Sequence, residues 1–351
     1  MAAVTVILST YGRPDTLACA VQSVLHQTQA DWRLLIIGDC CGEETSATLA
    51  PFLADSRIRY VNLPWRCGEQ AQLNSAGIAS AASDKIAFLN HDDLWLPSHL
   101  AAALDQLKIS GANFFFGRSA WIWKTPENLQ EPLALETISP IAQDFPRVFT
   151  SGIHCVEPAS AWVTTRELAQ RIGPWHSSSL IFRSPIQDWF LRAYRSGAQV
   201  TPGNDVTCLK FENQWSKEAP ARKYDTPATA QKVALNMMGS PTSLDALHSQ
   251  LRELANQPQA IGRGMDFNIA PVTAPRIEQI AKLLITEQAG KFYLQTGLDA
   301  YSWLCAEAGL PRGWRWQWAL QQRTGETPIT PPQQVDVAKY VQSALSQQGW
   351  S

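Results

Sequence analysis

Two glycine-rich patterns that mark phosphate-binding loops are missing from this sequence of 351 residues. It contains no G-x-G-x-x-G, the fingerprint of a dinucleotide-binding βαβ unit, and no G-x-x-x-x-G-K-[ST], the P-loop. Their absence argues against a Rossmann-type dehydrogenase and against a P-loop nucleotidase. A sugar-phosphate nucleotidyltransferase should also begin with a glycine-rich phosphate loop, so this class is disfavoured too.

Charge of either sign is not in excess. Lys and Arg number 29 and Asp and Glu 31, which gives a formal net charge of −2. A nucleic-acid-binding protein relies on a basic surplus, which this composition does not provide. The seven cysteines are an odd number without zinc-ligand spacing. We therefore expect free thiols in a reducing compartment and no disulfide framework.

Long apolar runs are missing as well, since no stretch approaches the roughly 20 residues that a bilayer-spanning helix needs. The first ten residues, MAAVTVILST, lack the basic start and the long apolar centre of a signal peptide. We therefore expect a cytoplasmic protein without a transmembrane segment. Peripheral contact with a membrane surface stays open.

The N-terminal part does contain a regular alternation of strand and helix patterns. Apolar, β-branched runs predict strands at 4–9, 32–39, 58–64 and 85–90. Segments with helical spacing separate them, the first being PDTLACAVQSVLHQT. This order is typical of βαβ units, so we predict an α/β fold with a mostly parallel central sheet flanked by helices.

The sequence changes character near residue 225. From there on, four segments have helical spacing, and stretches containing Pro and Gly separate them. We find no catalytic motif in this part. We therefore predict an α/β domain over residues 1–225 and a mainly helical C-terminal region of unknown role over residues 226–351.

Polar side chains follow the predicted strands at the points where they end. Thr10, Asp39, Arg66 and the pair Asp92 and Asp93 all lie just past strand ends. In parallel sheets, ligands bind outside the carboxyl ends of the strands. We therefore expect these side chains to converge on one ligand-binding rim.

The adjacent carboxylates of Asp92 and Asp93 need an explanation of their own. Two like charges repel, and each costs free energy to desolvate. A divalent cation such as Mg²⁺ or Mn²⁺ would offset both costs, because hard cations prefer carboxylate and phosphate oxygens. The alternative is a solvated Asp-Asp turn that caps the following helix.

Five ordered motifs resemble the family 2 glycosyltransferases, which have the GT-A fold. They are STYGRPDTL, IIGD, HDDLW with the following W-x-P-x-H-L, SAWVTTRELAQRIGPW and QDWFLRAYRSG. The resemblance covers about residues 3 to 215. It implies a hexosyltransferase type of enzyme, as in polysaccharide biosynthesis. Such an enzyme moves a sugar from a UDP-, GDP- or dTDP-linked donor to the hydroxyl of a carbohydrate or lipid-linked acceptor, with inversion and with a divalent cation.

The resemblance also implies roles on the donor side. It places Thr10, Tyr11 and Arg13 around the base and ribose, with Arg13 near a phosphate or the base. Asp39 would accept an N–H of the base, although a turn-forming role after the strand is the alternative. Arg66 would supply positive charge to the nucleotide.

Within the acidic pair, the resemblance has one carboxylate contact the ribose and the other the metal. We assign Asp93 to the metal and Asp92 to the nucleotide or the metal. Asn90 stands where many family members carry a further Asp, and it supplies no charge.

On the acceptor side, the resemblance makes Asp188 the general base that takes the proton of the attacking hydroxyl. Gln187 stands where the family usually has an acid. An ion pair between Asp188 and Arg192, four residues apart on one helix, is the alternative. Trp175 and Trp189 are predicted to form a sugar-stacking wall on the acceptor side, and His154 is a further predicted acceptor contact. Because Asn90 and Gln187 both reduce the charge of acidic motifs, a non-catalytic GT-A-like nucleotide- or carbohydrate-binding protein is the alternative function.

Overall fold

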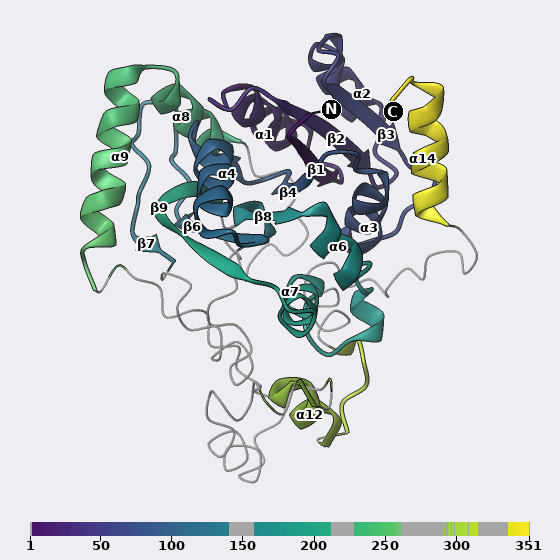
Figure 1. Cartoon of the computed structure of the whole chain (residues 1–351). Helices are drawn as coiled ribbons and strands as arrows, with labels where there is room; N and C mark the ends of the chain where they lie inside the picture. The colour runs from purple at the N-terminus through teal and green to yellow at the C-terminus, as the bar shows by residue number, and fades with distance from the viewer. Residues whose placement is uncertain are drawn as a thin grey trace.

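A computed structural model describes residues 2–139, 158–211, 228–258, 260 and 336–350, together with parts of 291–314. Residues 4–90 form a parallel βαβ sheet (Figure 1). The strands are β1 (Val4–Thr10), β2 (Trp32–Gly38), β3 (Ile58–Asn62) and β4 (Lys85–Asn90). Between them lie α1 (Pro14–Leu25), α2 (Glu43–Leu49), the 3-10 turn η1 (Phe52–Ala54) and α3 (Gln70–Ser80). Every residue of β1 is buried, as expected for a strand covered on both faces.

Beyond β4 the sheet becomes mixed. The elements in chain order are β5 (Leu94–Trp95), α4 (His99–Ser110), β6 (Phe114–Ile122), β7 (Thr137–Ile138), η2 (Ala159–Ala161), β8 (Trp162–Thr165), α6 (Arg166–Ile172), η3 (Ser178–Leu180), α7 (Pro185–Arg195) and β9 (Val200–Phe211). The sheet order is β3-β2-β1-β4-β8-β6-β9-β5, with β7 paired to β6. β8 runs antiparallel to β4 and β6, and β5 runs antiparallel to β9. The predicted parallel pairing therefore holds for β1 to β4, and the whole is a mixed sheet flanked by helices.

The described C-terminal helices are α8 (Thr229–Met238), α9 (Pro241–Ala255), α12 (Ala300–Glu307) and α14 (Val337–Gln347). Three of them, α8, α9 and α14, pack onto the sheet domain, whereas Cys305 of α12 packs against Phe182 (Figure 1). Residues of α8 and α9 share a hydrophobic core with β5, β6 and β9. Residues of α14 share one with β2, β3 and α3. The predicted helical character is confirmed for these segments, while the proposed boundary near residue 225 lies outside the described residues.

An aromatic cluster fills the centre of the molecule between the sheet and α7. Trp162 and Trp189 stack with their ring centroids 6.2 Å apart, and Trp175 stacks on Trp189 at 5.5 Å. Phe88 of β4 and Phe114 of β6 meet the same group edge-on or tilted. Burial of such large rings is a major contribution to core stability.

None of the described helices has the length and apolar character needed to cross a bilayer.

Candidate active site

The carboxyl ends of β1, β2 and β4 meet at one edge of the sheet. Thr10 is paired with Gly38, and Ser9 with Asn90, so the residues that follow these strands start from the same rim. The N–H of Asp39 donates to the carbonyl oxygen of Thr10 at 2.9 Å, which joins two of the strand ends directly. The hydroxyl oxygen of Thr10 is buried and has no hydrogen-bond partner among the described residues. It is therefore available to a ligand at the rim.

Asp92 and Arg13 form an ion pair across the rim. The Nη1 of Arg13 lies 3.0 Å from Oδ2 of Asp92, and both side chains are largely buried. Burial raises the pKa of Asp92, but the charges of His91, Lys210 and Arg13 outweigh it and hold this pKa below its ordinary value. Asp92 is therefore ionised at neutral pH, and it connects the segment after β1 to the segment after β4.

Asp93 is fully buried, and only one of its two oxygens is satisfied. Ser160 donates to Oδ2 of Asp93 at 2.6 Å, and the amide of Asn90 donates to the same atom at 2.9 Å. Oδ1 has no hydrogen-bond partner among the described residues. Burial, together with repulsion from Asp92, raises the pKa of Asp93 to about 6. A buried carboxylate oxygen without a partner is costly, so a positively charged ligand at Oδ1 would stabilise this site.

Lys210 lies beside the two carboxylates, although it comes more than a hundred residues later in the chain. β5 and β9 are antiparallel with Leu94 opposite Leu209, so the continued register places Lys210 opposite Asp93. The positive charge of Lys210 lowers the pKa of both Asp92 and Asp93. The rim therefore carries cationic groups from β9 and from the segment after β1, on either side of the acidic pair.

Asp39 is buried and accepts two backbone hydrogen bonds from the loop that precedes α3. The N–H groups of Cys67 and Gly68 donate to its two oxygens at 2.5 and 2.8 Å. Burial raises the pKa of Asp39, while these hydrogen bonds and the charge of Arg66 act in the opposite direction. Asp39 thus holds the loop against the rim, and contact with a nucleotide base, which stays a prediction, would use the remaining lone pairs of the carboxylate.

An Asp39→Ala variant is expected to bind a nucleoside diphosphate more weakly by about 1–3 kcal/mol, the scale for a lost charged hydrogen bond. The loop at 67–68 should loosen at the same time, because two N–H groups lose their acceptor. Isothermal titration gives the affinity, and Asp31→Ala, an exposed aspartate outside the rim, serves as the control. Unchanged nucleotide affinity with a lower melting temperature would leave Asp39 as a loop anchor only.

The guanidinium of Arg66 lies over the ring of Tyr11 at the same edge of the sheet. The guanidinium carbon of Arg66 lies 4.2 Å from the centroid of the Tyr11 ring, a cation–π contact. Nε of Arg66 is buried and has no hydrogen-bond partner among the described residues. The structure therefore brings together at one rim the residues whose strand-end positions predicted it: Thr10, Asp39, Arg66, Asp92 and Asp93. Tyr11 and Arg13, which follow β1, lie at the same rim.

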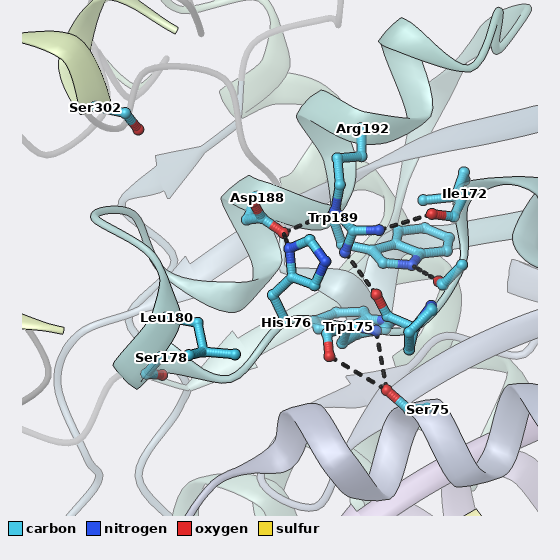
Figure 2. A network of polar contacts seen from close by, with 12 residues as sticks. Ser75, Ile172, Trp175, His176, Ser178, Leu180, Asp188, Trp189, Arg192 and Ser302 are labelled. Atoms are coloured by element: carbon cyan, nitrogen blue, oxygen red, sulfur yellow. Dashed lines mark hydrogen bonds and ion pairs between the residues drawn. The ribbon is translucent and has the colours of Figure 1, made fainter. Parts of the chain in front are cut away.

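Asp188, the predicted general base, is held by His176 and Arg192, two partners on and near α7 (Figure 2). Its Oδ2 lies 3.1 Å from Nδ1 of His176 and 2.9 Å from Nε of Arg192. Arg192 also donates to the carbonyl oxygens of Ile172 and Pro174, both at 2.7 Å. Burial raises the pKa of Asp188, but these partners outweigh it and leave the pKa below its ordinary value. The ion pair with Arg192 is therefore present, and the role as a base stays a prediction.

The environment of Asp188 is separate from the contacts of the acidic pair. Asp188 lines a cavity of about 530 Å³, whose described lining comes from residues 176–195, 297–302 and 312. Among the described residues, no hydrogen bond or ion pair connects Asp188 with Asp92 or Asp93. The structure thus has a rim with the pair Arg13–Asp92 and a cavity with Asp188, His176 and Arg192, each with its own polar contacts.

The prediction that Trp175 and Trp189 form a sugar-stacking wall is wrong. Both rings are buried, with exposed fractions of 3% and 0%, and they stack on each other inside the aromatic cluster. The indole N–H of Trp189 donates to the carbonyl oxygen of Gly173 at 3.0 Å (Figure 2). Large apolar rings gain more free energy in a core than at a wet surface, and the tertiary packing decided their place. His154 lies outside the described residues.

Three residues of the site were not found from the sequence. No sequence motif marks Lys210, Ser160 or His176 as a partner of a carboxylate. Each lies next to its carboxylate partner only because the order of the strands or the path of a loop brings the two segments together. The one available signal was the alternation in β9, where a lysine interrupts an otherwise apolar strand end. Such a charged residue in a buried strand calls for a partner of opposite charge.

Comparison with known families identifies the N-terminal segment. The sequence pattern of glycosyl transferase family 2 matches residues 5–173, and this segment belongs to that family.

The curated relatives are similar over shorter stretches. A UDP-Glc:alpha-D-GlcNAc-diphosphoundecaprenol beta-1,3-glucosyltransferase, WfgD of Escherichia coli, is 30% identical over 114 residues, which are 32% of this chain and 44% of that protein. Succinoglycan biosynthesis protein ExoO of Rhizobium meliloti is 30% identical over 109 residues, 31% of each chain. The matched part thus spans less than half the length of these relatives.

Solved structures are similar at lower identity. S. aureus TarS 1-349 in complex with UDP-GlcNAc superposes with a TM-score of 0.49 and 11% identity, over 88% of this chain and 92% of that chain. The mannosyltransferase PcManGT from Pyrobaculum calidifontis, in complex with GDP-Man and Mn2+, gives a TM-score of 0.46 and 14% identity, over 100% and 81% of the two chains.

Proposed function

We propose that this protein transfers a sugar from a nucleoside diphosphate donor to an acceptor hydroxyl, with inversion and with the help of Mg²⁺ or Mn²⁺. Membership of residues 5–173 in glycosyl transferase family 2 supports the class of reaction. Relatives named for succinoglycan and colanic acid biosynthesis support a carbohydrate or lipid-linked acceptor in polysaccharide assembly. The single observation that carries the proposal is the buried Oδ1 of Asp93 at the rim, which has no hydrogen-bond partner in the described part of the chain.

The residues at the rim fit a cation that takes most of its ligands from elsewhere. Within the described part of the chain, no three His, Cys, Asp or Glu side chains gather into a metal-binding group. Mg²⁺ commonly uses one or two carboxylates and completes its shell with phosphate oxygens and water. Asp93, through Oδ1, and Asp92 would hold the ion. The bound cation would stabilise the negative charge that grows on the diphosphate as it leaves.

The other rim residues bind and orient the donor. Arg13 and Lys210 provide positive charge for the diphosphate, and guanidinium groups match phosphate oxygens well. Thr10 offers a hydroxyl without a hydrogen-bond partner among the residues that the structure describes, and the ring of Tyr11 with Arg66 provides a plane on which a base can stack. Together they would keep the leaving group fixed while the sugar is attacked.

On the acceptor side, Asp188 would accept the proton of the attacking hydroxyl. The hydroxyl oxygen forms a bond to the anomeric carbon, the bond from that carbon to the diphosphate oxygen breaks, and the diphosphate departs with the electron pair. The acceptor hydroxyl becomes acidic only as its bond forms, so a carboxylate of modest basicity is sufficient. His176 and Arg192 both contact Oδ2 of Asp188, and they orient the carboxylate.

A non-catalytic nucleotide- or carbohydrate-binding protein is the second candidate. One observation favours it. His176 and Arg192 outweigh the effect of burial and hold the pKa of Asp188 below its ordinary value, and a carboxylate of lower pKa is a weaker base. Binding at the rim would be the same in both cases, so only turnover separates the two functions.

A thermal-shift panel of UDP-, GDP- and dTDP-linked sugars, each with and without Mn²⁺, tests the proposal. We expect one nucleotide series to raise the melting temperature, and Mn²⁺ to increase the shift. At a ligand concentration of about 100 times Kd, the expected stabilisation is roughly 2.7 kcal/mol. Slow hydrolysis of the same donor in the absence of acceptor would show catalysis. A panel without any stabilising nucleotide sugar would contradict the proposal.

A further inference from the structure

The cavity at Asp188 is rich in arginine. Its volume is about 530 Å³, within the range of roughly 300–1,000 Å³ of small-molecule sites. Its described charged lining consists of Arg183, Arg192, Arg195, Arg312, Asp188 and Asp299. Four guanidinium groups thus face two carboxylates among the described lining residues. Apolar side chains from η3 and α7 complete the wall.

Both carboxylates of this cavity are already engaged by neighbouring groups. Arg183 and Asp299 form an ion pair at 2.5 Å in which both side chains are buried. The N–H and hydroxyl of Ser302 donate to Asp299 at 3.0 and 2.6 Å, so both of its oxygens have donors. Asp188 is held by His176 and Arg192 through Oδ2. The acidic groups are therefore poorly suited to bind a cationic ligand, and positive charge prevails along the lining.

The two other arginines of the lining, Arg195 and Arg312, are exposed. Arg312 donates to the carbonyl oxygen of Leu180 at 2.9 Å, and its guanidinium lies 5.6 Å from the ring centroid of Phe182. Arg195, at the end of α7, packs its guanidinium against Gly297. Gly297 has a φ of 72°, and a Cβ there would collide with this guanidinium. The backbone at residue 297 thus leaves room for the Arg195 side chain at the cavity wall.

We propose that this cavity binds a phosphate or diphosphate group carried by the acceptor. Guanidinium groups pair with phosphate through two parallel hydrogen bonds, and a doubly charged group suits a lining in which arginine is in excess. The proposal rests on the proposed function, because Asp188 in the same cavity is the group that would meet the acceptor hydroxyl. The bound phosphate would anchor the acceptor beside this carboxylate. A soluble sugar phosphate and a lipid-linked sugar phosphate share the required chemistry.

Titration of the full chain with inorganic pyrophosphate in EDTA tests the site without any turnover. We expect the double variant Arg195→Gln, Arg312→Gln to bind pyrophosphate about tenfold or more weakly than the wild type, the scale for lost charge-assisted hydrogen bonds. Arg171→Gln is the matched control, because Arg171 is an exposed helical arginine outside the cavity. Its pyrophosphate affinity should equal that of the wild type. Equal affinities in the wild type and the double variant would overturn the proposal.

Two further arms identify the source of the phosphate and separate this inference from the proposed function. A sugar 1-phosphate that competes with pyrophosphate supports a soluble acceptor. Vesicles of phosphatidylcholine with and without phosphatidylglycerol are compared next. Binding of the wild type, but not of the double variant, only to the vesicles with phosphatidylglycerol supports a membrane-borne phosphate. Donor-sugar hydrolysis is measured on the same samples. If the donor is hydrolysed and the double variant binds pyrophosphate as well as the wild type, only the phosphate site is contradicted. If pyrophosphate binding depends on the two arginines but no nucleotide sugar is turned over, only the transferase proposal is contradicted.

Discussion

An Asp188→Asn variant is expected to transfer sugar about 100-fold more slowly than the wild type, or slower still, the usual scale for a lost general base. Asparagine keeps the shape of the side chain, and its carbonyl oxygen can still accept from Arg192, but it takes no proton. Donor affinity should stay nearly the same, because Asp188 lies in the cavity and not at the rim. Initial rates with a donor found in the panel, together with donor titration, measure both quantities.

The competing explanation gives a different result. If Asp188 only pairs with Arg192 and His176, the substitution should lower the free energy of unfolding by about 1–3 kcal/mol, the scale for hydrogen bonds to a largely buried charged group, and leave the transfer rate unchanged. Glu167→Gln is a suitable control, because Glu167 forms an i,i+4 pair with Arg171 on the neighbouring helix α6. A variant with wild-type transfer rate and a slightly lower melting temperature would assign Asp188 to structure and favour the binding-protein alternative.

The second large effect is expected at the rim. An Asp93→Asn variant should lose the part of nucleoside diphosphate affinity that depends on Mn²⁺, because the amide removes the charge that Oδ1 presents to the ion. The fold should remain intact. Asp93 is fully buried, its pKa is raised by that burial, and a neutral amide is less costly to bury than a carboxylate. Titration with a nucleoside diphosphate, with Mn²⁺ and with EDTA, measures the change.

Two variants show that this loss is specific. Asp84→Asn changes an aspartate whose side chain is 85% exposed, so its Mn²⁺ dependence should equal that of the wild type. Ser160→Ala removes one donor to Oδ2 of Asp93 but keeps the carboxylate, and it should weaken the Mn²⁺-dependent binding only in part. If Asp93→Asn retains the full Mn²⁺ effect, the metal is bound by residues other than Asp93.

Local pattern was sufficient for the first half of the fold and for the rim. Strands with continuous apolar residues separated by amphipathic segments have one common solution, the parallel βαβ sheet, so β1 to β4 were predictable from the sequence. The positions of Thr10, Asp39, Asp92 and Asp93 followed, because residues just past the ends of parallel strands share an edge. For these residues, the position in the chain directly after a strand determines the position in space, at the edge of the sheet where that strand ends.

The tertiary structure decided what crosses large sequence distances. The pairing of β5 with β9 brings Lys210 opposite Asp93, and the crossing of η2 brings Ser160 to the same carboxylate. Segments around residues 180, 195, 297 and 312 form the arginine-rich cavity. Trp189 illustrates the same limit, since its motif predicted a ligand contact and packing buried it completely. Sequence spacing determines the direction of a side chain within its own element. Which other element it meets depends on sheet order and core packing, whose free energies are summed over the whole chain.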